Sequence, residues 1–137
     1  LDGLTGAHAA ERIAGARHTI VKILAHLDFW QRWFVDRCDG HATPPPEHAA
    51  AGWPSVGPED WNRVHVSFLA GLTRVAELEP RAAHLVEPAI EFPAMAAYTI
   101  DHVITHVALH NAHHLGQVAT LRQIQGTWPP PAGSWTW

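Results

Sequence analysis

The segment His110-Asn-Ala-His-His114-Leu-Gly-Gln117 lies inside a long run whose apolar residues recur with helical spacing. Residues four apart on a helix share one face, with one residue a turn above the other. His110 and His114 therefore present two imidazoles to the same side. Two such rings can bind one divalent metal ion with bonds of about 2.0–2.1 Å. The segment thus predicts a long helix that carries two ligands of a metal site.

A third ligand has to come from another part of the chain, because catalytic metal sites generally use three protein ligands. His26 is the best candidate, since it lies in the middle of another apolar run, where an unpartnered imidazole is costly to bury. Two simpler interpretations stay open. His26 can be a core histidine whose nitrogens are satisfied by hydrogen bonds, and His110 and His114 can form an exposed polar face. His102 and His106 occupy earlier turns, but each step of four residues rotates about 40° beyond a full circle, which moves them off that face.

Two neighbouring side chains, Trp30 and Gln117, have two interpretations each. Trp30 follows His26 by one turn, so it either walls a substrate pocket or packs as a core tryptophan. Gln117 lies about one turn after His114, where it either hydrogen-bonds a ligand, a water or a substrate or caps the surface. His113 is rotated by about 100° from His114 and is expected to face away.

Helical periodicity fills most of the chain, and strand signals are nearly absent. Proline and glycine clusters interrupt it over residues 40–58 and 80–94, and the first is long enough to be a crossover or a functional loop. This pattern predicts an all-α helix bundle, with residues 1–137 as a single domain. The expected helices are a short one from Thr5 to Arg12 and long ones over about 19–37, over about 59–79, and from Met95 or Thr99 to Gln125.

Two groups of side chains receive a burial prediction. The apolar stripe of the helix over 59–79 is expected to consist of Trp61, Val64, Phe68, Leu72, Val75 and Leu78. Histidines in loop-like or terminal positions are expected to face solvent, namely His8, His18, His41, His48 and His84.

The composition excludes several classes of protein. The net charge of −4 and the lack of a basic stripe argue against a nucleic-acid partner. No run of 18 apolar residues and no signal-peptide pattern occurs, so neither a membrane span nor export is expected. The single cysteine, Cys38, rules out an internal disulfide and fits a cytoplasmic protein. It has no activating neighbour and is expected to be inert.

The chain resembles the DinB-like (DinB/YfiT) superfamily of metal-binding four-helix proteins. The matching segments are Thr19-Ile-Val-Lys-Ile-Leu-Ala-His26-Leu27, His110 to Gln117, Leu121-Arg-Gln123 and Gly126-Thr-Trp-Pro-Pro130. The resemblance implies a metal bound by His26, His110 and His114, a four-helix bundle of unusual helix order with the long linker as a crossover, and a homodimer. Such proteins usually begin with a longer helix than the segment starting at Leu1, so only the end of that helix is expected here, with either a truncated first helix or a compact family member as the reason.

The expected function is that of a protein binding one divalent ion, Zn, Ni or Fe. The resemblance implies a metal-dependent enzyme of thiol S-transferase or hydrolase type acting on a small molecule, with a low-molecular-weight thiol as a candidate partner. The ligands are His26, His110 and His114, with Trp30 and Gln117 as candidate substrate contacts; no general base can be named. Two alternatives stay open: a non-catalytic metal- or ligand-binding stress-response module, and a purely structural domain with incidental histidines.

Overall fold

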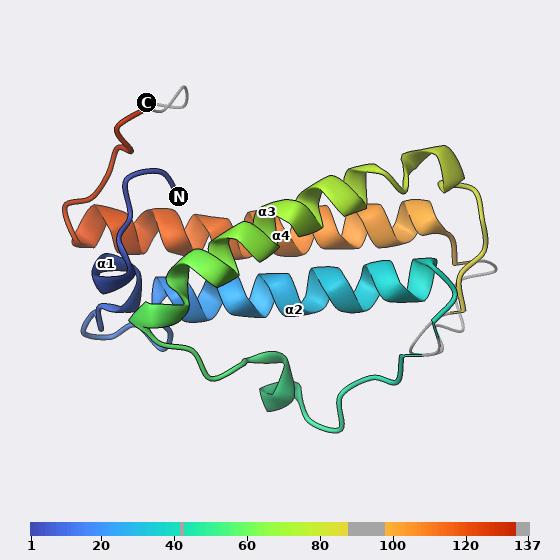
Figure 1. Cartoon of the computed structure of the whole chain (residues 1–137), viewed down its shortest axis with the longest axis horizontal. Helices are drawn as coiled ribbons and strands as arrows, with labels where there is room; N and C mark the ends of the chain where they lie inside the picture. The colour runs from blue at the N-terminus through green and yellow to red at the C-terminus, as the bar shows by residue number, and fades with distance from the viewer. Residues whose placement is uncertain (42, 88–97, 134–137) are drawn as a thin grey trace.

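The computed structural model describes residues 1–41, 43–87 and 98–133 (Figure 1). This described part is all-α, as predicted, and contains no β-strand. Its helices are α1 (Gly6–Ala10), α2 (Ile20–Cys38), α3 (Trp61–Ala76) and α4 (Ile100–Ile124), with 3-10 turns η1 (Ala49–Gly52), η2 (Pro58–Asp60) and η3 (Glu79–Arg81) between them. Met95, one of the two expected starts of the last helix, lies outside the described residues.

The long linker is a crossover, as expected. It leaves the end of α2 and returns along the outside of the bundle, so α3 starts near the beginning of α2 and runs in the same direction (Figure 1). Helix α4 runs back antiparallel to α2. Helix α2 packs against both α3 and α4 and is the central element of the arrangement.

Local signals set the helix ends. The Thr5 side chain accepts a hydrogen bond from the backbone N–H of His8 (3.2 Å) and caps α1, while Thr19 and Thr99 occupy the N-cap positions of α2 and α4. Gly126, just beyond α4, has a φ of +68°, a left-handed conformation that glycine adopts without steric cost. These ends fall within two residues of the expected ones.

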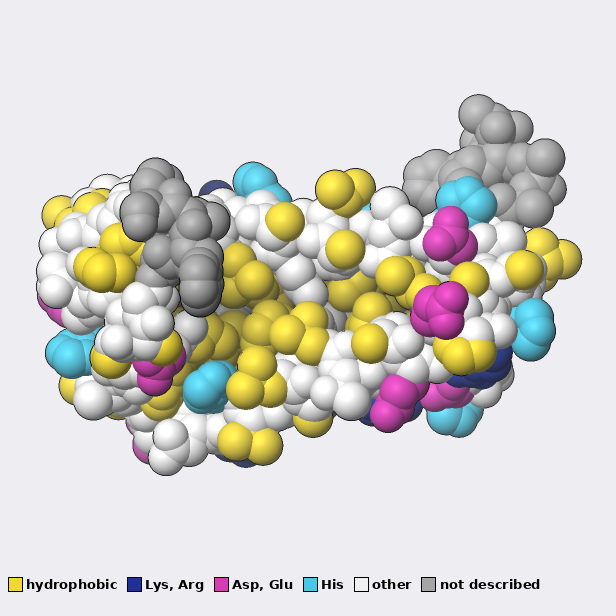
Figure 2. Space-filling view, turned by 90° about the horizontal axis from the view of Figure 1, so that it is seen from above, with side chains coloured by type: hydrophobic (Ala, Val, Ile, Leu, Met, Phe, Trp, Pro, Cys, Tyr) yellow, Lys and Arg dark blue, Asp and Glu magenta, His cyan; other side chains and the backbone are white. Residues whose placement is uncertain are grey.

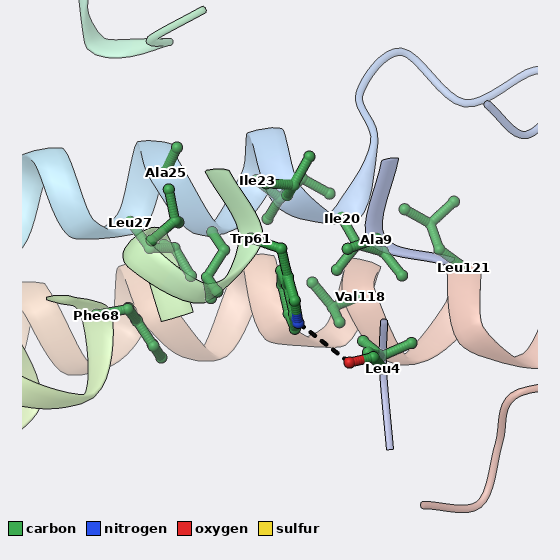
Figure 3. Packing of buried hydrophobic residues seen from close by; sticks show 13 residues of the cluster. Leu4, Ala9, Ile20, Ile23, Ala25, Leu27, Trp61, Phe68, Val118 and Leu121 are labelled. Carbon is green, nitrogen blue, oxygen red and sulfur yellow. Dashed lines mark hydrogen bonds between the residues drawn. The ribbon is translucent and has the colours of Figure 1, made fainter. Parts of the chain in front are cut away.

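A buried polar layer divides the core into two hydrophobic clusters. One cluster surrounds Trp61, whose indole N–H donates to the Leu4 carbonyl (3.0 Å; Figure 3), and the other lies toward Cys38. Between them, Asn111 of α4 donates from its side-chain amide to Gln31 of α2 (2.8 Å), and Gln31 donates to the Phe68 carbonyl of α3 (3.2 Å). This layer ties the three long helices together just beside the level of His110.

The predicted stripe of α3 is wrong at one position. Trp61, Val64, Phe68, Val75 and Leu78 are buried, but Leu72 is 38% exposed. Gly71 occupies the corresponding buried position, next to the Gln31 amide. The alternating steps of three and four that start at Trp61 lead to 71 rather than 72, and a residue without a side chain leaves room there for the polar layer. Helix α3 is also shorter than the expected 59–79, because η2 and η3 form its two flanks.

The surface carries apolar side chains as well. Hydrophobic side chains gather along the middle of the face seen in Figure 2. On α3, Val66 and Leu69 are 67% and 47% exposed, and Leu109 of α4 is 67% exposed. Among the described residues, no helix combines the length and the apolar content needed to cross a membrane.

Candidate metal centre

The three histidines singled out in the sequence lie together. His26 comes from α2, and His110 and His114 come from adjacent turns of α4; one nitrogen from each ring lies within 4.8 Å of the other two. The Nε2 atoms of His26 and His110 are 3.2 Å apart. With bonds of about 2.0–2.1 Å, tetrahedral geometry places two ligand nitrogens about 3.3 Å apart. The His26–His110 pair is at this separation, and a modest inward shift would bring His114 to the same ion.

Two of the rings are oriented by hydrogen bonds on their far side. Nδ1 of His26 lies 2.5 Å from the carbonyl oxygen of Gly52, an atom that can only accept, so Nδ1 carries the proton. Nδ1 of His114 donates in the same way to Oε1 of Gln117 (3.0 Å), whose amide N–H₂ donates to His113 (3.2 Å). Protonation at Nδ1 leaves the Nε2 lone pair free to bind a cation, which is the usual arrangement around metal-ligating histidines.

The electrostatics keep two of the rings neutral. Burial lowers the pKa of His110 to about 4, helped by the neighbouring His114 and His26. Burial also lowers the pKa of His26, against the smaller opposing effect of its bond to Gly52. Imidazoles must be neutral to bind a metal. Three neutral nitrogen donors from two helices fit a divalent transition-metal ion, which such donors bind readily.

A family model described as the DinB superfamily matches residues 1–118 of the chain. The chain belongs to the DinB superfamily. Comparison with curated proteins and with solved structures returned no match. The family assignment agrees with the all-α fold of the chain.

The linker of this DinB superfamily member supplies a site residue that the sequence analysis missed. Trp53, directly after η1, stacks on His26 with ring centroids 3.7 Å apart, and its ring is roughly perpendicular to that of His114, with centroids 5.7 Å apart. The preceding Gly52 lies so close to Trp30 that an added Cβ would be 2.8 Å from the indole nitrogen. Glycine is therefore needed for the linker to reach His26. In the sequence, the role of Trp53 is indicated only by the linker, which is longer than a normal connection between two helices.

His18 departs from its prediction. His8, His41, His48 and His84 are exposed as expected, but His18 is half-buried and stacks on Trp53 at 3.8 Å. The reason is again Trp53, which the crossover brings back over the start of α2. Burial lowers the pKa of His18.

The remaining histidines of α4 stand outside the group. His102 accepts a hydrogen bond from the Thr99 backbone N–H (3.2 Å) and helps to cap the helix. His106 is exposed, with its ring 6.2 Å from that of His110. His113 is exposed, as expected, and contacts the site only through Gln117.

The two other predicted site residues lie at the edge of the group. Trp30 is half-buried, with its ring 6.4 Å from that of His26, and it lines a cavity that His110 also lines. Gln117 is exposed and contacts the group through His114.

Proposed function

We propose that this DinB superfamily member is a metal-dependent enzyme acting on a small molecule, with one ion, Zn, Ni or Fe, held by His26, His110 and His114. The observation that carries the proposal is the convergence of three imidazole nitrogens from two helices within 4.8 Å of one another. When bound, such an ion acts as a Lewis acid that makes a thiolate or hydroxide available near neutral pH. This chemistry suits a thiol S-transferase or a hydrolase.

The surrounding residues have separate roles in this proposal. Gly52 and Gln117 fix the orientation and tautomer of two ligand rings through the bonds at Nδ1. Trp53 covers one side of His26 and limits the access of water from the linker side. Trp30 is the wall that contacts the substrate. Because three neutral imidazoles leave the charge of the ion uncompensated, an anionic thiolate or carboxylate is the favoured additional ligand.

A non-catalytic role is the second candidate, and one observation favours it. The three ligands join α2 to α4, so an ion between them would cross-link two helices and stabilise the folded state by binding energy alone. Such a module would show metal-dependent stability without turnover.

Two measurements separate these possibilities. Metal analysis of protein purified without a nickel column tests whether the site exists. Thiol-transfer assays with glutathione, bacillithiol and mycothiol against a generic electrophile, and an esterase assay, then test for turnover. Stoichiometric metal with turnover supports the enzyme, while stoichiometric metal without turnover in any assay favours the binding module.

We also propose a homodimer. The apolar side chains of Val66, Leu69 and Leu72 recur every three residues along α3 and are all exposed. A second copy of the chain that packed on this row would remove these apolar side chains from water. Analytical ultracentrifugation should give a dimer that Leu69→Glu converts to monomer, and a wild-type monomer would contradict the proposal.

A further inference from the structure

A second feature of the molecule lies directly beside the candidate metal centre. A cavity of about 260 Å³ opens next to His110, between α2, α4 and the linker. Its lining is rich in aromatic side chains: Trp30, Trp33, Phe34 and Tyr98. An apolar cavity of about 150 Å³ is enough to bind benzene, so this one can hold a substituted aromatic ring.

Arginine and carboxylate side chains are scarce among the described lining residues of the cavity, where Arg37 alone represents them. Arg37 lines it, but its guanidinium donates to the carbonyls of Thr43 (2.9 Å) and Glu87 and lies over the Trp33 ring at 5.0 Å. These contacts occupy N–H groups of Arg37 and hold its guanidinium against the wall of the cavity. Burying a charged group against aromatic rings is costly, so the part of a ligand that fills this cavity is expected to be neutral.

Polar character is concentrated at the end formed by α4. His106 and His110 both line the cavity, with near-parallel rings 6.2 Å apart, and Phe34 faces His106 at 4.8 Å. Among the described residues, Nδ1 of His110 has no hydrogen-bond partner, in contrast to Nδ1 of His26 and of His114. A His110 ring that binds an ion through Nε2 carries a proton on Nδ1 and can donate it to a ligand.

We propose that this cavity binds an uncharged aromatic ring that carries a hydrogen-bond acceptor, and that this ring is the specificity-determining part of the substrate. The inference rests on the proposed function, because it places the reacting end of the same molecule at the ion. The ring packs against the wall formed by Trp30 and Phe34, whose own rings are 6.2 Å apart, and the acceptor faces His106 and His110. The enzyme would then select aromatic substrates over aliphatic ones of equal size.

The test uses 4-fluorobenzyl alcohol as the probe and ¹⁹F NMR titration as the measurement, with metal-free and zinc-loaded protein. His106→Trp on exposed α4 surface fills the cavity and should weaken binding at least about tenfold. Leu109→Trp adds the same bulk to the same helix outside the cavity and should leave affinity within about twofold. Equal affinity in all three proteins, an equal loss in both variants, or no saturable binding would overturn the proposal.

A second pair keeps the test decisive if His106→Trp does not fold: Phe34→Ala removes a wall of the cavity, and Phe29→Ala removes a neighbouring ring outside it. Metal content is measured on the same samples. Wild-type protein that carries the metal but does not bind the aromatic probe overturns this inference alone. Absent metal with aromatic binding retained overturns the proposed function alone.

Discussion

The indole ring of Trp53 lies flat against the imidazole of His26, with centroids 3.7 Å apart and planes 10° from parallel. The two residues are 27 positions apart in sequence, and the contact exists because the crossover linker runs back along α2. The carbonyl oxygen of Gly52, the residue before Trp53, accepts a hydrogen bond from Nδ1 of the same imidazole. One short turn of the linker therefore both orients a candidate ligand and covers it.

Gly52→Ala should weaken metal binding about 10–100-fold, the usual effect of losing an outer hydrogen bond to a ligand. The added Cβ would lie 2.8 Å from the Trp30 indole nitrogen, so the linker has to move away and take its carbonyl from His26. Competition with a chromophoric chelator measures the affinity. Ala51→Ser, at an exposed neighbouring position, is the control, and equal affinity of the two variants would refute the role of the turn.

Gln117→Leu should also weaken metal binding about 10–100-fold, because Nδ1 of His114 loses its acceptor. Gln117→Glu keeps an oxygen acceptor at the same place and should retain most of the affinity. The same chelator competition compares the two variants. If both lose affinity equally, the contribution of Gln117 is not that of an acceptor.

Gln31→Met should lower the free energy of unfolding by about 1–3 kcal/mol, because it leaves the buried Asn111 amide without its partner. Adding Asn111→Leu to this variant removes the unpaired amide and should recover part of the loss. Urea unfolding of the two single variants and the double variant gives the coupling energy. Strictly additive effects would show that the two side chains act independently.

Cys38 provides a pH-dependent prediction. Burial raises the pKa of its thiol from the usual 9.0 to about 11. The unfolded chain therefore releases the thiol proton at lower pH than the folded chain, and stability present below pH 9 is lost as the pH rises toward 11. Urea unfolding between pH 8 and 10.5 should show this decline, and Cys38→Ala should show a smaller one. An identical decline in both proteins would show that the Cys38 thiol does not cause the loss of stability.

The sequence predicts the helices and the histidine group well, because both depend on periodicity. Apolar spacing from Ile20 to Phe34 marks α2, and the four-residue step from His110 to His114 marks one face of α4. A mid-helix histidine at position 26 then stands out as a polar residue at a core position. Each of these patterns lies within a single helix, so it can be recognised in the sequence without knowledge of the tertiary structure.

Other features depend on contacts between elements and leave no periodic trace. Trp53 lies in an irregular linker whose path follows from the whole fold. Gly71 replaces Leu72 at a buried position because Gln31 needs the space, although hydrophobicity alone favours the leucine. Asn111 resembles a surface residue in sequence, and only its bond to Gln31 explains its burial.

Quantitative metal analysis of protein purified without a nickel column tests the central claim most directly. Wild-type protein should carry close to one Zn, Ni or Fe ion per chain. His26→Ala, His110→Ala and His114→Ala should each lose it, while His102→Ala and His113→Ala, on the same helix as two of the ligands, should keep it. A metal-free wild-type protein whose melting is unchanged by chelators, or equal retention in all five variants, would contradict the site.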